Sequence, residues 1–321
     1  MTSASPRPAA TRRPTAESAF HPLSSRHRSW RLPLVLLLVL CSLTLTPVQA
    51  DDTQPTPALI SLDWSMTETL LAIGVTPLGV AAPESYARWV GAPAIPAGVH
   101  DIGLRDQPNL ELLARLDPDG IVTVSFLAGD SRLSRIAPVH AFDIYTGSRD
   151  PWQRALKVTR QLGRLTHHEQ GAERLISRVR QQLAGARRDT RSDQPPVAVL
   201  QFIDNRHVRI YGEGSLFQAV FDQIGLTNAW QGEVNNWGFR QLGIDELARL
   251  PADTRLLVIR PLPTAVNGQL EDNILWQHLP AVRRGRVHEL APVWSFGGLA
   301  SMARFAGEVA QALPATEGAT P

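Results

Sequence analysis

Apolar residues recur at intervals of three and four over residues 152–186, which is the period of an amphipathic helix. Shorter apolar runs alternate with helix-like segments on either side of this stretch, a pattern typical of βα units. Gly163 interrupts the helical pattern, and Thr166 and Glu169 have the spacing of a capping box, so we expect a new helix over residues 166–185. Such a helix would reach roughly 30 Å. The sequence therefore predicts an α/β protein whose two lobes are joined by one long α-helix.

The chain divides around this helix into five predicted parts. These are a signal peptide over 1–50, an N-terminal α/β lobe over 51–150, a helical connector over 151–195, a C-terminal α/β lobe over 196–315 and a disordered tail over 316–321. We expect the clearest strands at 121–126 and 139–144 in the first lobe, and at 197–203, 208–211 and 256–259 in the second. Further helices are expected near 215–224 and 300–313.

The first fifty residues have the features of a secretory signal. Three arginines precede an apolar run over 32–40, and the small residues that end at Ala50 suit signal peptidase. A membrane anchor is the alternative, but polar residues and a proline after Cys41 interrupt the roughly 20 apolar residues that a spanning helix needs. We therefore expect cleavage before Asp51 and a periplasmic location. Because Cys41 is the only cysteine, the mature chain would have no thiol for catalysis, metal binding or a disulfide.

The charge balance excludes one class of partner. The whole chain has 32 basic and 30 acidic residues, and removal of six arginines and one glutamate with the leader leaves 26 and 29, a net charge of −3. The mature protein has no basic excess that would attract nucleic acid. The hydrophobic content of 43% is sufficient for two core-bearing lobes.

The sequence resembles the ferrichrome-type hydroxamate-siderophore binding proteins of Gram-negative bacteria in four segments. These are Asp-Ile-Gly-Leu-Arg-Asp-Gln-Pro-Asn-Leu-Glu-Leu-Leu at 101–113, Leu-Asp-Trp at 62–64 leading into 67–74, the stretch 215–238 with its Asn-Ala-Trp-Gln-Gly-Glu and Trp-Gly motifs, and Pro-Val-Trp at 292–294. The resemblance runs in order through residues 59–313. It implies a periplasmic substrate-binding protein of an ABC importer, with the ligand in a shallow cleft between lobes that a single rigid helix joins.

The resemblance also implies the partners. They are an iron(III)-hydroxamate siderophore, bound as ligand rather than as cofactor, and an inner-membrane ABC permease with its ATPase. We expect the protein to be a monomer. Relatives contact the permease through one acidic residue per lobe, for which Glu111 and Glu246 are our candidates; either could instead be a solvated helix charge.

A trihydroxamate fills all six coordination positions of iron(III), so its binding protein supplies no metal ligand. Aromatic faces suit the apolar surface of such a complex, and a cation suits its hydroxamate oxygens. The resemblance assigns Arg105 as the donor and Trp89, Trp237 and Trp294 as the walls. Spacing alone would make the arginine a surface residue and the tryptophans core residues. Trp237 lies in a polar segment typical of a loop, which favours its assignment to the wall.

Two tyrosines of the family are missing. Phe126 or Leu127 stands where relatives carry the first, and Phe296 stands where they carry the second. The predicted site thus lacks two hydroxyl donors, each contributing about 1 kcal/mol. Tyr86, three residues before Trp89, is a candidate replacement. A more lipophilic hydroxamate or a mixed citrate-hydroxamate is therefore as compatible with the sequence as ferrichrome.

Haem or a corrinoid is the alternative ligand for the same scaffold. His100, His140 and His207 are available to haem iron, but none lies in a matching motif, and a lone histidine is more often structural. Catecholate siderophores, which are strongly anionic, would need a cluster of cations. The mature chain has one lysine, Lys157, and Arg105 has no obvious basic companion in the sequence.

A secreted metallo-hydrolase is the alternative from another class. His167 and His168 are adjacent and so face different directions on a helix, and neither H-x-x-x-H nor H-E-x-x-H occurs. The segment around Ser215 is not a nucleophile elbow, because no glycine follows the serine by two positions. The sequence therefore favours a binding protein over an enzyme.

Overall fold

The computed structural model describes residues 55–146, 149–190, 194–264, 266, 268–270 and 272–314. The predicted signal peptide over 1–50 and the predicted tail over 316–321 lie outside these residues. Within the described ranges, no helix has the length and apolar character needed to cross a membrane.

The first sheet is entirely parallel. Its order is β3-β2-β1-β4-β5, from β1 (Leu59–Ser61), β2 (Gly79–Val80), β3 (His100–Asp101), β4 (Gly120–Thr123) and β5 (Val139–Ala141). The helices α2 (Trp64–Ile73), α3 (Pro83–Trp89) and α4 (Leu110–Leu116) follow its first three strands, and the short 3₁₀ helix η1 (Leu133–Arg135) precedes its last. Successive strands are added on one side of β1 and then on the other. Sheets of this type bind ligands beyond the carboxyl ends of the strands at this reversal of order.

The second sheet is mixed. Its order is β10-β9-β6-β7-β8, from β6 (Val197–Phe202), β7 (His207–Tyr211), β8 (Phe239–Gly243), β9 (Arg255–Ile259) and β10 (Val287–Leu290). The first three strands of this order are parallel, whereas β7 is antiparallel to both β6 and β8. Around the sheet lie α7 (Leu216–Ile224), α8 (Ile274–His278), α9 (Pro280–Arg283) and the 3₁₀ helix η2 (Ile244–Arg249). The strands predicted at 197–203, 208–211 and 256–259 are confirmed to within one residue, whereas β8 and β10 were not predicted.

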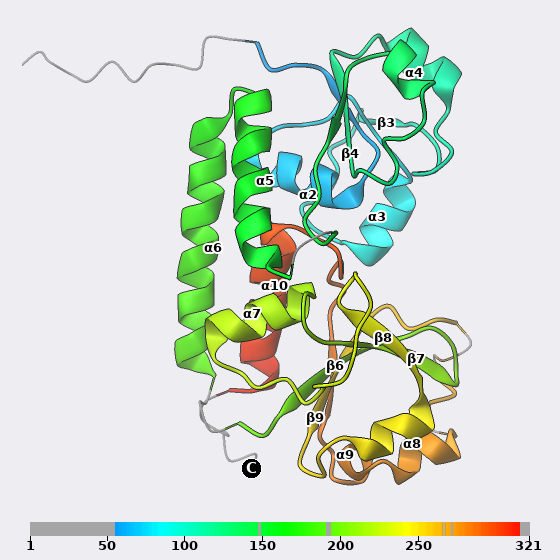
Figure 1. The fold of residues 1–321 in the computed structure, drawn as a ribbon, viewed down its shortest axis with the longest axis vertical. Helices are drawn as coiled ribbons and strands as arrows, with labels where there is room; N and C mark the ends of the chain where they lie inside the picture. The colour runs from blue at the N-terminus through cyan, green and yellow to red at the C-terminus, as the bar shows by residue number, and fades with distance from the viewer. Residues whose placement is uncertain are drawn as a thin grey trace, which may run out of the picture. The chain divides into compact units, whose positions relative to one another are not determined.

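The chain passes from the first sheet to the second through α5 (Pro151–Leu165) and α6 (Glu169–Asp189), and α10 (Leu299–Ala312) follows the last strand and packs with them. Figure 1 shows α5 and α6 side by side, and α6 also packs on α10. With 21 residues, α6 is about 30 Å long. One hydrophobic cluster contains residues from both sheets together with all three helices, for example Leu59, Ile176, Val199 and Phe305. The prediction of a long connecting helix is confirmed, and the shared core packs this helix against both sheets.

The predicted capping box at Thr166 is wrong. Thr166 is the C-cap of α5, and its hydroxyl donates to the carbonyl of Leu162 at 2.8 Å. The chain then turns through His167, whose φ of +57° is left-handed, and α6 begins at Glu169. The hydroxyl of Thr166 is bonded back to the preceding helix, so Thr166 ends α5 instead of starting α6. The two helices form a hairpin.

Gly163 was expected to break the helical pattern, but it lies inside α5. A Cβ atom there would lie 2.8 Å from the Cβ of Ala172 on α6. Gly171 has the same role on α6, since a Cβ atom would lie 2.2 Å from the carbonyl oxygen of Ile73 at the end of α2. The two glycines therefore permit α6 to pack closely against α5 and α2.

A buried carboxylate ties α2 to the start of α10. Glu68 is fully buried, and its oxygens accept hydrogen bonds from the backbone N–H of Gly298 at 3.0 Å and from the hydroxyl of Ser301 at 2.6 Å. A guanidinium nitrogen of Arg304 lies 3.6 Å away. Burial raises the pKa of Glu68 to about 7, against the opposing effect of Arg304 and the two hydrogen bonds. The carboxyl group therefore takes up a proton near neutrality.

We predict that Glu68→Gln removes part of the pH dependence of stability. The folded-state pKa lies above the ordinary value of 4.5, so the folded protein binds more protons than the unfolded chain, and its free energy of unfolding falls as pH rises from 4.5 to about 7. The fall amounts to about 3 kcal/mol for a shift of this size. Urea unfolding at a series of pH values should show that Glu68→Gln lacks it. Glu84→Gln, on an exposed side chain of α3, is the control, and equal pH slopes for wild type and Glu68→Gln would contradict the assignment.

Candidate functional site: an aromatic cleft with one guanidinium

A cleft of about 250 Å³ lies where the carboxyl ends of the first sheet meet the second lobe. Its lining from the first lobe follows β1, β3, β4 and β5, which places it at the reversal of strand order. The lining residues are Asp63, Ser65, Arg105, Val124, Phe126, Asp143, Ile144, Tyr145 and Thr146 from this lobe, and Trp237, Phe239, Trp294 and Phe296 from the second.

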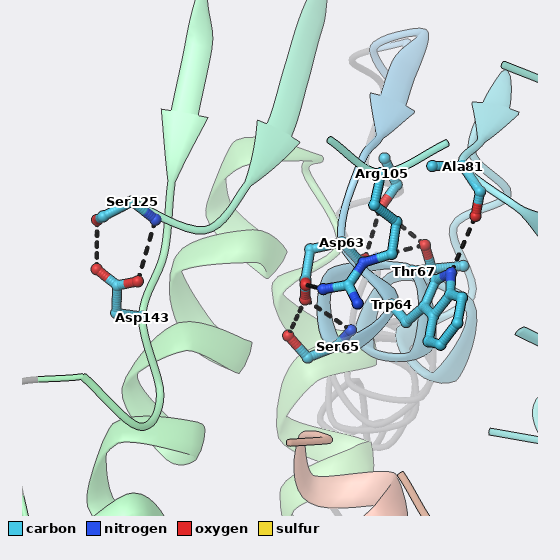
Figure 2. A network of polar contacts seen from close by, with 9 residues as sticks. Asp63, Trp64, Ser65, Thr67, Ala81, Arg105, Ser125 and Asp143 are labelled. Atoms are coloured by element: carbon cyan, nitrogen blue, oxygen red, sulfur yellow. Dashed lines mark hydrogen bonds and ion pairs between the residues drawn. The ribbon is translucent and has the colours of Figure 1, made fainter. Parts of the chain in front are cut away.

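Asp63 fixes the position of the arginine in the cleft. One carboxylate oxygen accepts the backbone N–H of Ser65 at 2.8 Å and also its hydroxyl, so Asp63 is the N-cap of α2. The other oxygen accepts a hydrogen bond from Nη2 of Arg105 in an ion pair (Figure 2). The side chain of Asp63 is only 5% exposed, whereas that of Arg105 is 24% exposed. The carboxylate is thus buried behind the guanidinium, which faces the cleft.

Two tryptophans hold the guanidinium from the sides. The Cζ atom of Arg105 lies 4.8 Å from the ring centroid of Trp64 and 5.6 Å from that of Trp294, both within cation–π range. Trp64 is itself held by a 2.9 Å hydrogen bond from Nε1 to the carbonyl of Ala81 and by an edge contact with Trp294 at 4.9 Å. Among the described residues, neither Nη1 nor the buried Nε of Arg105 has a hydrogen-bond partner. Both nitrogens keep donor capacity that the protein does not use.

Aromatic rings make up most of the remaining wall. Edge-on contacts run from Phe126 to Trp237 at 5.6 Å, from Trp237 to Phe296 at 5.4 Å and from Phe296 to Trp294 at 5.4 Å. Phe126 follows β4 of the first lobe, and the other three rings belong to the second lobe. Phe126 is 59% exposed, which is unusual for a large apolar side chain. The wall therefore presents apolar surface that a bound molecule would cover.

A tight loop places Trp237 in the wall. The side-chain oxygen of Asn235 accepts the backbone N–H groups of Trp237 at 2.9 Å and of Phe239 at 3.3 Å. Gly238 has a φ of +75°, and a Cβ atom there would lie 2.3 Å from the backbone nitrogen of Ser215. Any other residue at position 238 would displace the loop, so the Asn-Asn-Trp-Gly motif has a direct geometric basis.

The structure does not bring Tyr86 into the cleft, and the interpretation of Tyr86 as a replacement donor is wrong. Tyr86 is 1% exposed, and its hydroxyl donates to the carbonyl of Pro93 at 2.8 Å. Burial raises its pKa, so the hydroxyl stays protonated and occupied. Trp89 does not line the cleft either. It lies in a second pocket that shares Arg105 and Trp294 with the cleft.

Asp143 and Tyr145 line the cleft but were not predicted. Asp143 accepts the backbone N–H of Ser125 at 3.1 Å and also its hydroxyl (Figure 2). Tyr145 is buried, its hydroxyl donates to the carbonyl of Gly297, and burial raises its pKa well above the ordinary range. The hydroxyl proton of Tyr145 is therefore already engaged in a hydrogen bond within the protein. Neither residue belongs to a motif; their position after the last strand of the parallel sheet is the signal that would have found them.

The two acidic candidates for permease contact differ in the interactions that their carboxylates make within the protein. Glu111 is exposed in the first turn of α4. Glu246, in η2, accepts the backbone N–H of Gly243 at 3.2 Å and lies 3.9 Å from a guanidinium nitrogen of Arg249. Glu246 therefore stabilises the start of its own helix. The carboxylate of Glu111 accepts no hydrogen bond from the described residues.

The cleft contains no set of protein donors suited to a bare metal ion. No histidine lines it, and within the described ranges no three or more histidine, cysteine, aspartate or glutamate residues are close enough to hold a metal. One guanidinium among aromatic rings suits instead a ligand that carries its own complete coordination shell and presents oxygen acceptors.

The chain belongs to the periplasmic binding protein family, which it matches over residues 59–293. It is 34% identical to the iron(3+)-hydroxamate-binding protein FhuD of Escherichia coli over 249 residues, which are 77% of this chain and 83% of that protein. It is 29% identical to the achromobactin-binding periplasmic protein of Dickeya dadantii, covering 86% and 91% of the two chains. Among solved structures it resembles Vibrio cholerae FhuD bound to Fe³⁺-Desferal, with a TM-score of 0.73, 31% identity and coverage of 80% of this chain and 98% of that one.

We predict that Trp237→Ala reduces the fluorescence change on ligand binding and weakens binding by about 1 kcal/mol or more, because the variant loses the ring that contacts both Phe126 and Phe296. Fluorescence titration of the purified protein measures both effects. Trp276→Phe is the matched control, since Trp276 packs on Phe202 away from the cleft. Unchanged affinity in Trp237→Ala would count against the wall assignment.

Proposed function

We propose that this protein captures an iron(III)-hydroxamate siderophore in the cleft at Arg105 and delivers it to an inner-membrane ABC importer for iron uptake. The observation that carries the proposal is a single guanidinium, held between Trp64 and Trp294, in a cleft otherwise lined mostly by aromatic rings. Relatives named for hydroxamate and other siderophore binding support the same class of ligand. The function proposed is binding and delivery, with no chemical step.

The proposed binding mode follows from the chemistry of the complex. Three hydroxamates neutralise iron(III), so the ligand is apolar outside and has partly negative oxygens around the metal. Arg105 would donate to these oxygens, and Phe126, Trp237 and Phe296 would cover the apolar surface. The phenylalanines at 126 and 296 offer no hydroxyl, so binding would depend more on apolar contact and on Arg105 than in a site with two tyrosines.

Location and organisation complete the proposal. We infer that residues 1–50 direct export and are removed, and that the mature protein works in the periplasm as a monomer. Its functional parts would be the N-terminal lobe over 51–150, the connector over 151–195 and the C-terminal lobe over 196–315. The arginine-rich, apolar leader supports export.

Parallel titrations of the mature protein would test the ligand class. We expect saturable quenching of tryptophan fluorescence by ferrichrome, ferrioxamine or a ferric citrate-hydroxamate, and none by a ferric catecholate or haemin. Trp237 and Trp294 line the cleft and Trp64 lines the adjoining pocket, so bound ligand would lie close to several fluorophores. A response to haemin alone would replace the proposal with haem uptake.

We expect Arg105→Ala to weaken hydroxamate binding about 30-fold, which corresponds to about 2 kcal/mol for a charge-assisted hydrogen bond. Because this change leaves Asp63 buried without its partner, the double variant Asp63→Asn with Arg105→Ala should be titrated as well; asparagine keeps the N-cap of α2. Arg115→Ala, an exposed arginine at the end of α4, is the control. Normal affinity in both Arg105 variants would place hydroxamate recognition elsewhere.

We propose that Glu111 and Glu246 contact basic residues of the permease. Glu111→Arg should then reduce siderophore-dependent iron uptake in cells several-fold and leave ligand affinity unchanged, because the residue lies outside the cleft. Glu246→Arg should also reduce uptake, although part of its effect would come from the lost contact with Gly243. Glu84→Arg on exposed α3 controls for charge reversal. Full uptake with Glu111→Arg would remove Glu111 from the docking surface.

A further inference from the structure

A second pocket adjoins the cleft on the far side of Arg105. It has a volume of about 480 Å³ and shares Arg105 and Trp294 with the cleft. Its additional lining includes Arg88 and Arg209, which we call the arginine pair. Arg105 has no obvious basic companion nearby in the sequence, because these two arginines are 17 and 104 positions away from it along the chain. The fold brings all three to one pocket.

The arginine pair joins opposite lobes. Arg88 lies on α3 beside Trp89, and Arg209 lies on β7. Neither has a carboxylate within ion-pair distance among the described residues. No aspartate or glutamate lines the pocket, whereas Asp63 and Asp143 line the cleft. The positive charge of the second pocket is therefore not neutralised locally.

Contacts within the protein hold Arg209 in position. Its Cζ atom lies 4.9 Å from the ring centroid of Phe239, a residue that also lines the cleft. Two positions along β7, the buried Tyr211 donates its hydroxyl proton to the side-chain oxygen of Gln201 at 2.9 Å and can accept a hydrogen bond from the hydroxyl of Ser295 at 3.0 Å. A guanidinium fixed on a ring loses less side-chain entropy when it binds an anion than a free surface arginine does.

A ligand bound at Arg105 can reach both spaces, because Arg105 and Trp294 line the cleft and the second pocket alike. The second pocket, of about 480 Å³, is larger than the cleft of about 250 Å³. A siderophore complex centred at Arg105 therefore has room to extend past Trp294 into the second pocket. The group that enters it meets two unneutralised arginines.

We propose that the arginine pair is a subsite for an anionic group, a carboxylate above all, on the periphery of the siderophore. The inference rests on the proposed function and adds to it a substrate class: hydroxamate siderophores that bear a carboxylate outside the iron centre. Arg105 recognises the iron-bound oxygens, and Arg88 and Arg209 recognise the peripheral charge. Guanidinium groups suit this role because they bind carboxylates in a planar, charge-assisted geometry.

A series of ligands with one iron centre tests the subsite. Ferric Desferal carries a terminal amine outside its neutral tris-hydroxamate core; acetylation removes the positive charge, and succinylation replaces it with a carboxylate. We expect the wild-type protein to bind the succinylated complex about tenfold more tightly than the acetylated one. Arg209→Gln and Arg88→Gln should each bring this ratio towards one and leave affinity for the acetylated complex nearly unchanged. The preference should also shrink as salt concentration rises.

Arg240→Gln is the matched control, because Arg240 is exposed on β8 beside β7 and lines neither pocket. It should retain the tenfold ratio. Equal affinity of wild type for all three complexes, or an unchanged ratio in both glutamine variants, would overturn the subsite and leave the proposed function standing. Tightest binding of the amine form would also overturn it, and would assign charge selection to Asp143. Failure of all three complexes to bind would overturn the subsite as stated; the proposed function would fall with it only if ferrichrome and a ferric citrate-hydroxamate also failed to bind.

Discussion

The ion pair between Asp63 and Arg105 links the start of the fold to the chemistry of the cleft. The carboxylate begins α2 by capping it, and with its other oxygen it holds the guanidinium over Trp64. A buried pair of this kind contributes little net stability, since desolvation offsets most of the Coulomb attraction. Its main effect is positional. A long, flexible side chain is fixed at the reversal of strand order, with N–H donors that the protein leaves unused.

A shared core and a buried carboxylate connect the two lobes. Leu59 and Val199, from different sheets, belong to one hydrophobic cluster with α5, α6 and α10, and Glu68 adds polar contacts to the start of α10. Separation of the lobes would expose this shared core and leave a buried carboxylate without its donors. Large hinge motions would therefore cost free energy, which favours a cleft that is largely preformed. Preformed aromatic walls suit capture of a rigid iron complex, because little side-chain freedom is lost on binding.

The sequence was sufficient for the parts of this arrangement that are encoded locally. Continuous apolar runs identified β6 and β9, and helical periodicity identified the long helix, although its start was displaced because the hydroxyl of Thr166 turns back to Leu162. The cleft required tertiary information. Tyr86 is three residues from Trp89, and only the packing of α3 shows that its hydroxyl turns inward to Pro93. Likewise, no local pattern relates Asp143 or Arg209 to Arg105, because a sheet edge and an opposite lobe bring them together.

The distribution of charge explains how one binding site can both recognise hydroxamate complexes and discriminate among them. Asp63 neutralises Arg105, so this arginine adds little to the long-range field, and its attraction for hydroxamate oxygens acts at contact distance. Arg88 and Arg209 have no such counter-charge among the described residues and therefore act over a longer range. Iron-bound oxygens occur in every hydroxamate complex, whereas peripheral charge differs from one siderophore to another. Recognition of the class thus resides in the neutralised arginine, and discrimination within the class resides in the arginines that remain charged.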